Sequence, residues 1–123
     1  MSVRLIPRSA LQRREYADPV SIAVSLAELQ TKLDQYPWGY LVTVSDQQRA
    51  HSLAVPSQYV DGVLTVSAGG GTRANAMARP DVTMVFPPAS GTEYSLIIDG
   101  RAQVFADHIE FTPTSAVLHR PAL

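Results

Sequence analysis

Residues 63–86, VLTVSAGGGTRANAMARPDVTMVF, decide the fold expected for this chain. The runs VLTVSA and DVTMVF are rich in β-branched residues, which favour strands. Between them, TRANAMAR can form about two helical turns, which Pro80 is expected to end. The order strand, glycine turn, helix, strand places three consecutive glycines directly before the helix.

The rest of the chain reads mainly as short strands separated by turn signals. WGYLVTVS (38–45) and AHSLAVPSQYV (50–60) precede the central block, and EYSLIIDGRAQVFA (93–106) follows it. HIEFTP and SAVLH then add one or two short strands. The pattern contains five to seven strands and one or two helices, without the regular alternation of strand and helix that is typical of a parallel α/β fold. The sequence therefore predicts a mainly β fold, a small antiparallel barrel.

Three positions qualify this strand pattern. Asp61-Gly62 favours a tight hairpin turn, and Asp99-Gly100 indicates either a bulge or a hairpin. Pro56 has no amide proton for a strand ladder, so its strand is expected at a sheet edge, bulged or broken nearby.

One helix is predicted near the start of the sequence. Ser25 and Glu28 form an S-x-x-E capping pattern, and leucines recur at helical spacing up to Leu33, before Pro37. Residues 1–24 show no clear period and are expected to form an N-terminal arm. Residues 25–123 are then expected to form a single domain.

Composition excludes several classes of function. Ten Lys and Arg against eleven Asp and Glu give a formal net charge of -1 without a basic block, so nucleic acid is not an expected partner. The absence of cysteine excludes thiolate catalysis and iron–sulfur clusters. No apolar run approaches the roughly 18 residues that cross a bilayer, and no signal-peptide pattern begins the chain, so we expect a cytoplasmic protein without a membrane span.

The glycines have two interpretations. If Thr72 caps the following helix, backbone amides, the helix dipole, the threonine hydroxyl and the Arg73 guanidinium converge on an anion such as phosphate. Neither the Walker A pattern nor the G-x-G-x-x-G fingerprint is present, and glycine turns between a strand and a helix are also common without a ligand.

Catalytic and metal-binding patterns are absent from the sequence. His51, His108 and His119 show no metal-ligand spacing, so no metal site is expected. No G-x-S-x-G elbow occurs, and spacing selects no set of serine, histidine and acid. We therefore assign no catalytic residue.

The order of these elements resembles the pyridoxamine 5'-phosphate oxidase-like proteins, the FMN-binding split β-barrel family, including its short actinobacterial and F420-using branches. The resemblance covers about residues 25–120. It depends on the helix before WGYLVTV, on RAHSLAVP (49–56), on the block 63–86 and on FTPTSAVLHRPA (111–122).

The resemblance implies FMN or the deazaflavin F420 as cofactor, a small-molecule substrate, and a homodimer with the cofactor at the subunit interface. It places His51, Ser52 and Leu53 along the isoalloxazine ring, and it assigns the ribityl chain and phosphate to Ser67, Ala68, Gly71, Thr72, Arg73 and nearby Asn75. Many members carry a lysine in the phosphate segment, which this chain lacks, so Arg73 supplies the cation.

These implications lead to an expected function and its alternatives. The leading hypothesis is an oxidoreductase that transfers a hydride between FMN or F420 and a small organic molecule, with the cofactor carrying the chemistry. A non-catalytic flavin or haem binding or storage module is the alternative, in which His51, His108 or His119 would be the axial haem ligand. A dimeric barrel that has lost its cofactor site is a third interpretation.

Overall fold

The structure is a computed structural model that describes residues 19–89 and 92–122. Eight strands, one 3-10 turn and two helices follow one another along this part of the chain. In chain order they are β1 (Ser21–Val24), η1 (Leu26–Glu28), α2 (Leu29–Leu33), β2 (Trp38–Val44), β3 (Ala50–Pro56), β4 (Tyr59–Val60), β5 (Val63–Ser67), α3 (Gly70–Ala78), β6 (Asp81–Phe86), β7 (Ser95–Val104) and β8 (His108–His119).

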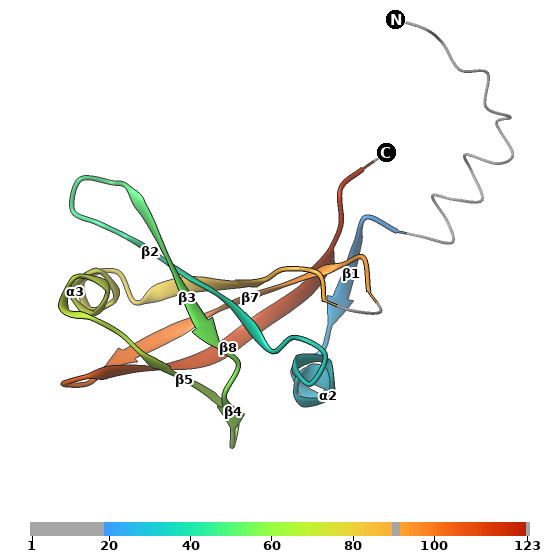
Figure 1. Ribbon diagram of the computed structural model, residues 1–123, viewed down its shortest axis with the longest axis horizontal. Coiled ribbons are helices and arrows are strands. Elements are labelled where there is room, and N and C mark those ends of the chain that lie inside the picture. Colours follow the sequence, from blue (N-terminus) through green and yellow to red (C-terminus); the bar gives the residue numbers. More distant parts are fainter. Residues whose placement is uncertain (1–18, 90–91, 123) are drawn as a thin grey trace, which may run out of the picture.

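All strands belong to one antiparallel sheet in the order β3-β2-β6-β7-β8-β5-β4, with β1 also paired to β8. The sheet curls into a half-barrel, with α2 and α3 at opposite ends (Figure 1). The predicted fold class, a mainly β, antiparallel split barrel with short helices, is confirmed. No helix in the described residues is both long and apolar enough to cross a membrane.

One face of the sheet forms the core. Side chains alternate between the two faces of a strand, so residues directly opposite each other on neighbouring strands share a face. The register brings Leu41, Met84, Ile98 and Ala116 into one row across β2, β6, β7 and β8, and all four are buried. This row anchors the concave side of the half-barrel.

The opposite face carries a second apolar row. Tyr40, Val85, Ile97, Val117 and Ala23 lie opposite one another across β2, β6, β7, β8 and β1. None of these five side chains is fully buried. The convex side of the sheet is therefore apolar along a line that crosses five strands.

The strand predictions at Asp61-Gly62 and Pro56 are confirmed. Asp61 and Gly62 have φ angles of 53° and 79° and join β4 to β5, as a two-residue hairpin turn requires. Pro56 is the last residue of β3, which lies at the edge of the sheet.

Asp99-Gly100 forms the bulge rather than the hairpin, because the β7–β8 register shifts between these two residues. A Cβ on Gly100 would lie 2.5 Å from Phe111 Cζ and from the Thr112 carbonyl oxygen, so only glycine fits there. The two segments HIEFTP and SAVLH form one continuous strand, β8.

The two predicted helices form with altered bounds. The first divides into η1 and α2, and the Ser25 hydroxyl accepts a hydrogen bond from the Glu28 amide as predicted. The last four residues of the expected N-terminal arm form β1. Residues 1–18 of that arm lie outside the described residues.

Candidate cofactor site

The glycine turn connects the end of β5 to the start of α3. Ser67 ends β5, Ala68 is buried, and Gly69 is the N-cap with φ -73° and ψ 174°. The helix begins at Gly70, and the Arg73 amide donates its first hydrogen bond to the Gly69 carbonyl oxygen. The predicted role of Thr72 as the cap is therefore wrong: glycines accept helical dihedrals, so the helix begins two residues before Thr72.

The start of α3 presents bare amides. The first amides of a helix have no partner within the helix, and no side chain in the described part of the chain caps this one. A Cβ built on Gly69 or Gly71 meets nothing within 4 Å, and on Gly70 it meets only Arg73 Nη2, at 3.9 Å. Internal packing therefore does not demand these glycines, and they leave open space in front of the amides.

Arg73 is held beside this turn. Its Nε donates a hydrogen bond to the Ala68 carbonyl oxygen at 3.0 Å, and the Ala68 amide donates to the Asp107 carbonyl oxygen at 3.4 Å. The guanidinium is thus fixed next to Gly70 rather than extended into solvent. Amides, dipole and guanidinium at one helix start fit a phosphate group.

The second group of predicted residues lies on the edge strand β3. His51 and Ser52 are exposed and Leu53 is half-buried, and they pair with Thr43, Val42 and Leu41 of β2. An edge strand leaves one side of its backbone without a strand partner. This side could meet the polar edge of a bound ring.

Asn75 and Thr43 connect the two groups of predicted residues. Asn75 Nδ2 donates a hydrogen bond to Thr43 Oγ1 at 3.2 Å, and Thr43 is the register partner of His51. Asn75 therefore fixes α3 against the β2–β3 pair. Thr43 was not among the predicted site residues, although it follows buried Gly39 and Leu41 at every second position of WGYLVTV, and a threonine on a buried face indicates a buried polar contact.

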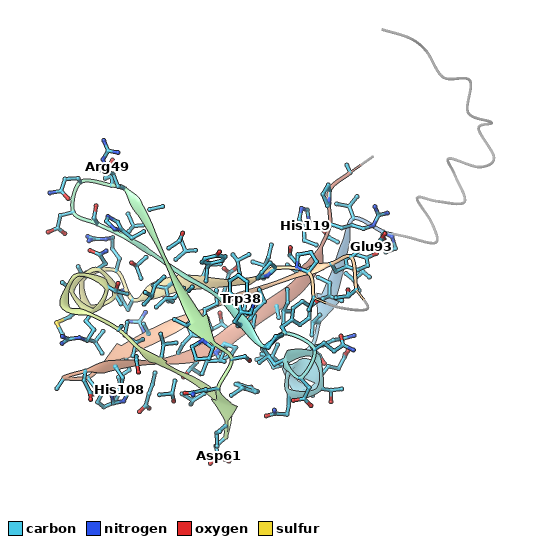
Figure 2. The ribbon with its side chains drawn as sticks, in the orientation of Figure 1. Trp38, Arg49, Asp61, Glu93, His108 and His119 are labelled. Atoms are coloured by element: carbon cyan, nitrogen blue, oxygen red, sulfur yellow. The ribbon has the colours of Figure 1, made fainter. Side chains whose placement is uncertain are left out.

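An ionic cluster around His108 lies at the start of β8 (Figure 2), and His108 is the register partner of Ser67, the residue that ends β5 before the glycine turn. His108 Nδ1 lies 2.8 Å from Asp107 Oδ1, and Nε2 lies 3.2 Å from Glu110 Oε2. The hydrogen bonds to Asp107 and Glu110 raise the pKa of His108 above its ordinary value, and the hydrogen bond from His108 lowers the pKa of Asp107. His108 is consequently engaged on both ring nitrogens.

The three histidines are not brought together. His108 and His119 are the first and last residues of β8, about 36 Å apart at 3.3 Å per residue. His51 lies on β3, and His119 Nδ1 contacts the Ser21 hydroxyl at 3.2 Å. Within residues 19–89 and 92–122, no group of three or more histidine or acidic side chains could hold a metal ion.

Two mycobacterial proteins are similar to this chain in sequence. The uncharacterized proteins Mb0449c of Mycobacterium bovis and MT0457 of Mycobacterium tuberculosis are each 37% identical to it over 119 positions. The match covers 80% of this chain and 82% of each relative, so the chain belongs to one family with them. No family model matches the sequence.

Solved structures share the curled sheet. A proposed pyridoxamine 5'-phosphate oxidase from Corynebacterium glutamicum superposes with a TM-score of 0.62 at 11% identity, over 86% of this chain and 98% of that one. An FAD-binding protein from Mesorhizobium loti gives 0.63 at 13% identity, over 80% and 98%. A protein named F420 reductase gives 0.56 at 18% identity, over 69% and 93%.

The chain therefore has the split-barrel fold of these structures. The resemblance to the pyridoxamine 5'-phosphate oxidase-like proteins, stated from RAHSLAVP and the glycine block, is thereby confirmed for the fold. At 11 to 18% identity, these superpositions show that the fold is shared. The roles of individual residues in the split barrel remain predictions.

Proposed function

We propose that this split barrel binds a flavin, FMN or the deazaflavin F420, and acts as an oxidoreductase that transfers a hydride to or from a small organic molecule. The observation that carries the proposal is the start of α3, where open glycine amides and a fixed guanidinium meet. Proteins of this fold include one named for FAD binding and one named F420 reductase, which supports a flavin-type cofactor.

Each part of the site has a defined task. The amides of Gly70, Gly71 and Thr72 donate to phosphate oxygens, and Arg73 adds a charge-assisted hydrogen bond. The edge strand β3, with His51, lies along the ring. A bound flavin or deazaflavin supplies the hydride chemistry, so the protein needs only to bind, orient and exclude water.

Asn75 has a positioning role in this proposal. Its amide joins α3 to Thr43, the strand partner of His51. The distance between the phosphate turn and the edge strand is therefore fixed by a hydrogen bond with buried Thr43. This fixed spacing orients a cofactor that contacts both elements.

We also propose that the protein is a homodimer with the cofactor at the subunit interface. The convex apolar row from Tyr40 to Ala23 is flanked by Trp38, whose ring meets Tyr40 edge-on at 5.1 Å between centroids. Trp38 is 43% exposed and Tyr40 37%, so a second copy would bury both aromatic rings. β3 adjoins this face, so a cofactor along β3 would contact the second copy.

Sedimentation analysis tests the dimer. The wild type should sediment as a dimer, and Tyr40→Arg should sediment as a monomer with weakened flavin binding, because a charge replaces the exposed aromatic ring at the β2 end of the apolar row. A wild-type monomer at micromolar concentration would contradict this part of the proposal.

Anaerobic titration with FMN and F420, followed by absorbance, tests the cofactor. Spectral shifts at micromolar concentration are expected, and the reduced cofactor in the loaded protein should then be oxidised by a member of a panel of small carbonyl and quinone acceptors. Absence of binding to FMN, FAD and F420 would overturn the proposal. Tight binding without turnover, or a haem Soret band in the purified protein, would favour the storage module.

A further inference from the structure

A hollow lies between α2 and β4, whereas the glycine turn lies beyond the other end of β5 (Figure 1). Its volume is about 700 Å³, within the range of small-molecule sites, roughly 300–1,000 Å³. We call it the α2 hollow. It shares no residue with the candidate cofactor site or with the apolar row proposed for the dimer. A ligand in the α2 hollow would therefore occupy a place of its own.

The backbone around the α2 hollow is held in place by hydrogen bonds. The Ser57 amide donates to the Pro37 carbonyl oxygen at 2.9 Å, and the Thr65 amide donates to the Gln58 carbonyl oxygen at 3.1 Å. These two bonds join the segment after β3 to the residue before β2 on one side and to β5 on the other. Tyr36, which also lines the hollow, is 1% exposed and is fixed in the core. A preformed wall of this kind lowers the ordering cost of binding.

Polar side chains line the α2 hollow without partners of their own. Within residues 19–89 and 92–122, six such side chains make no hydrogen bond or ion pair with another residue. They come from three separate segments: the end of α2, the stretch from the end of β3 through β4, and β5. Carboxylate, amide and hydroxyl groups are thus available to a ligand. The six residues are Gln30, Asp34, Ser57, Gln58, Tyr59 and Thr65.

The charge of the α2 hollow selects a cation. Asp34 is its one charged lining residue in the described part of the chain, and it is exposed. Asp34 is also the C-cap of α2, where the negative end of the helix dipole adds to the attraction for a cation. The glycine turn, with Arg73 and helix amides, has the opposite preference. The two ends of β5 therefore suit ligands of opposite charge.

The neutral lining residues favour a ligand that also carries hydroxyl groups. Amide and hydroxyl side chains both donate and accept hydrogen bonds, as the hydroxyl groups of a sugar do. Tyr59 adds a half-buried aromatic ring that packs against the core and can contact the apolar face of a sugar ring. A simple alkylammonium ion would use only Asp34, whereas a hydroxylated amine would use the amides and hydroxyls as well.

We propose that the α2 hollow binds a hydroxylated organic amine with one positive charge, an amino sugar. The Asp34 carboxylate pairs with the ammonium group, and the neutral side chains bind the hydroxyl groups. This site goes beyond the proposed flavin-dependent function and does not depend on it, because the two sites have no residue in common.

NMR titration at pH 6.0 and low salt tests the inference with glucosamine and with glucose, which has a hydroxyl in place of the amine. The signals followed are the backbone amides of residues 30–36 and 57–60. The wild type should bind glucosamine at least about 10-fold tighter than glucose, because only the amine forms a charge-assisted hydrogen bond. Asp34→Asn should reduce the affinity for glucosamine to that for glucose and should leave FMN affinity unchanged.

Asp61→Asn is the matched control. It removes one carboxylate from the neighbouring β4–β5 turn, which does not line the α2 hollow, and asparagine tolerates the φ angle of 53° at this position. This variant should bind glucosamine as the wild type does. Equal weakening by Asp34→Asn and Asp61→Asn would overturn the inference, since net charge rather than the position of Asp34 would then govern binding.

Absence of shifts at these amides at about 10 mM glucosamine would also overturn the inference, as would equal wild-type affinities for glucosamine and glucose. The result is distinguishable from that of the cofactor titrations. Amine binding without flavin binding would overturn the proposed function alone, and flavin binding without amine binding would overturn this inference alone.

Discussion

The two helical segments of this protein begin in opposite ways. Ser25 closes the start of η1 with its side chain, accepting from the Glu28 amide and donating to the Glu28 carboxylate at 2.8 Å. The segment then buries Leu29 and Leu33 in the core. Helix α3 begins with glycines, lacks a side-chain cap within the described residues, and buries only Ala76 along its length.

This difference separates stability from binding. In the η1–α2 segment, the Ser25 side chain accepts a hydrogen bond from the Glu28 amide, and leucine side chains are buried in the core, so this segment stabilises the barrel. The start of α3 leaves amide donors next to a fixed guanidinium, and no side chain among residues 19–89 and 92–122 caps them, so these donors are open to a ligand. Substitutions at the two ends should therefore have separable effects on unfolding and on flavin affinity.

The largest effect is expected for Leu29→Ala at the α2 end. Truncating a fully buried leucine should lower the free energy of unfolding by about 2–5 kcal/mol, measured by chemical denaturation. The folded variant should retain its flavin affinity. Leu26→Ala, at a 46% exposed position of the same segment, is the control and should change stability by less than about 0.5 kcal/mol. Similar losses in both variants would contradict the role given to burial.

Arg73→Ala should have the next largest effect, at the α3 end. Loss of a charge-assisted hydrogen bond should weaken FMN binding by about 10- to 100-fold, measured by fluorescence titration. Arg79→Ala is the matched control because Arg79 follows the same helix but contacts Val44 and Asp46 at its other end. Equal weakening by the two variants would show that net charge, rather than the position of Arg73, governs binding.

Substitutions at the two N-cap positions, Ser25 and Gly69, should change the free energy of unfolding in opposite directions. Ser25→Ala should lower the free energy of unfolding by about 1 kcal/mol without affecting the flavin site. Gly69→Ser should raise it by a few tenths of a kcal/mol, because a hydroxyl can then cap α3, and should weaken FMN binding, because that hydroxyl competes for the same amides. Unchanged FMN affinity in Gly69→Ser would argue against a phosphate at these amides.

The smallest expected effect is the pH dependence of the His108 cluster. Because the pKa of His108 is raised on folding, its stabilisation is complete below its ordinary pKa of 6.5 and is lost as pH rises through the raised value. The lowered pKa of Asp107 acts at the other extreme, where stability is lost as pH falls below about 3.8. Thermal unfolding at pH 5.5 and 8.5 should show a larger decrease for the wild type than for His108→Gln.

Local signals predicted much of this fold. The capping pattern at Ser25, the dipeptide Asp61-Gly62 and the proline at the end of β3 each determine the conformation of their own few residues. These predictions hold because the interactions involved lie within a few positions of each other in the sequence.

Features that depend on distant residues were not predictable in this way. The pairing of β1 with β8 joins residues about a hundred positions apart, and the bulge at Gly100 depends on the approach of Phe111 from β8. Threonine and glycine are both acceptable N-cap residues, so the sequence alone did not decide between Thr72 and Gly69 as the cap of α3. The structure shows that the helix begins at Gly70 and that Gly69 is its N-cap.

The candidate site shows the same division. The glycine turn that we propose as the phosphate site lies within one short stretch, and the resemblance to the family assigned Gly71, Thr72 and Arg73 to it. The contact of Asn75 with Thr43 and the stacking of Phe105 on His108 depend on how strands and helix meet, so only the structure reveals them.

Comparison of FMN with riboflavin, which lacks the phosphate, tests the central claim about the start of α3 most directly. Calorimetric titration of the wild type should give an affinity for FMN at least about 10-fold higher than for riboflavin, and Arg73→Ala should abolish most of that difference. Equal affinities for the two ligands in the wild type would contradict a phosphate site at the glycine turn.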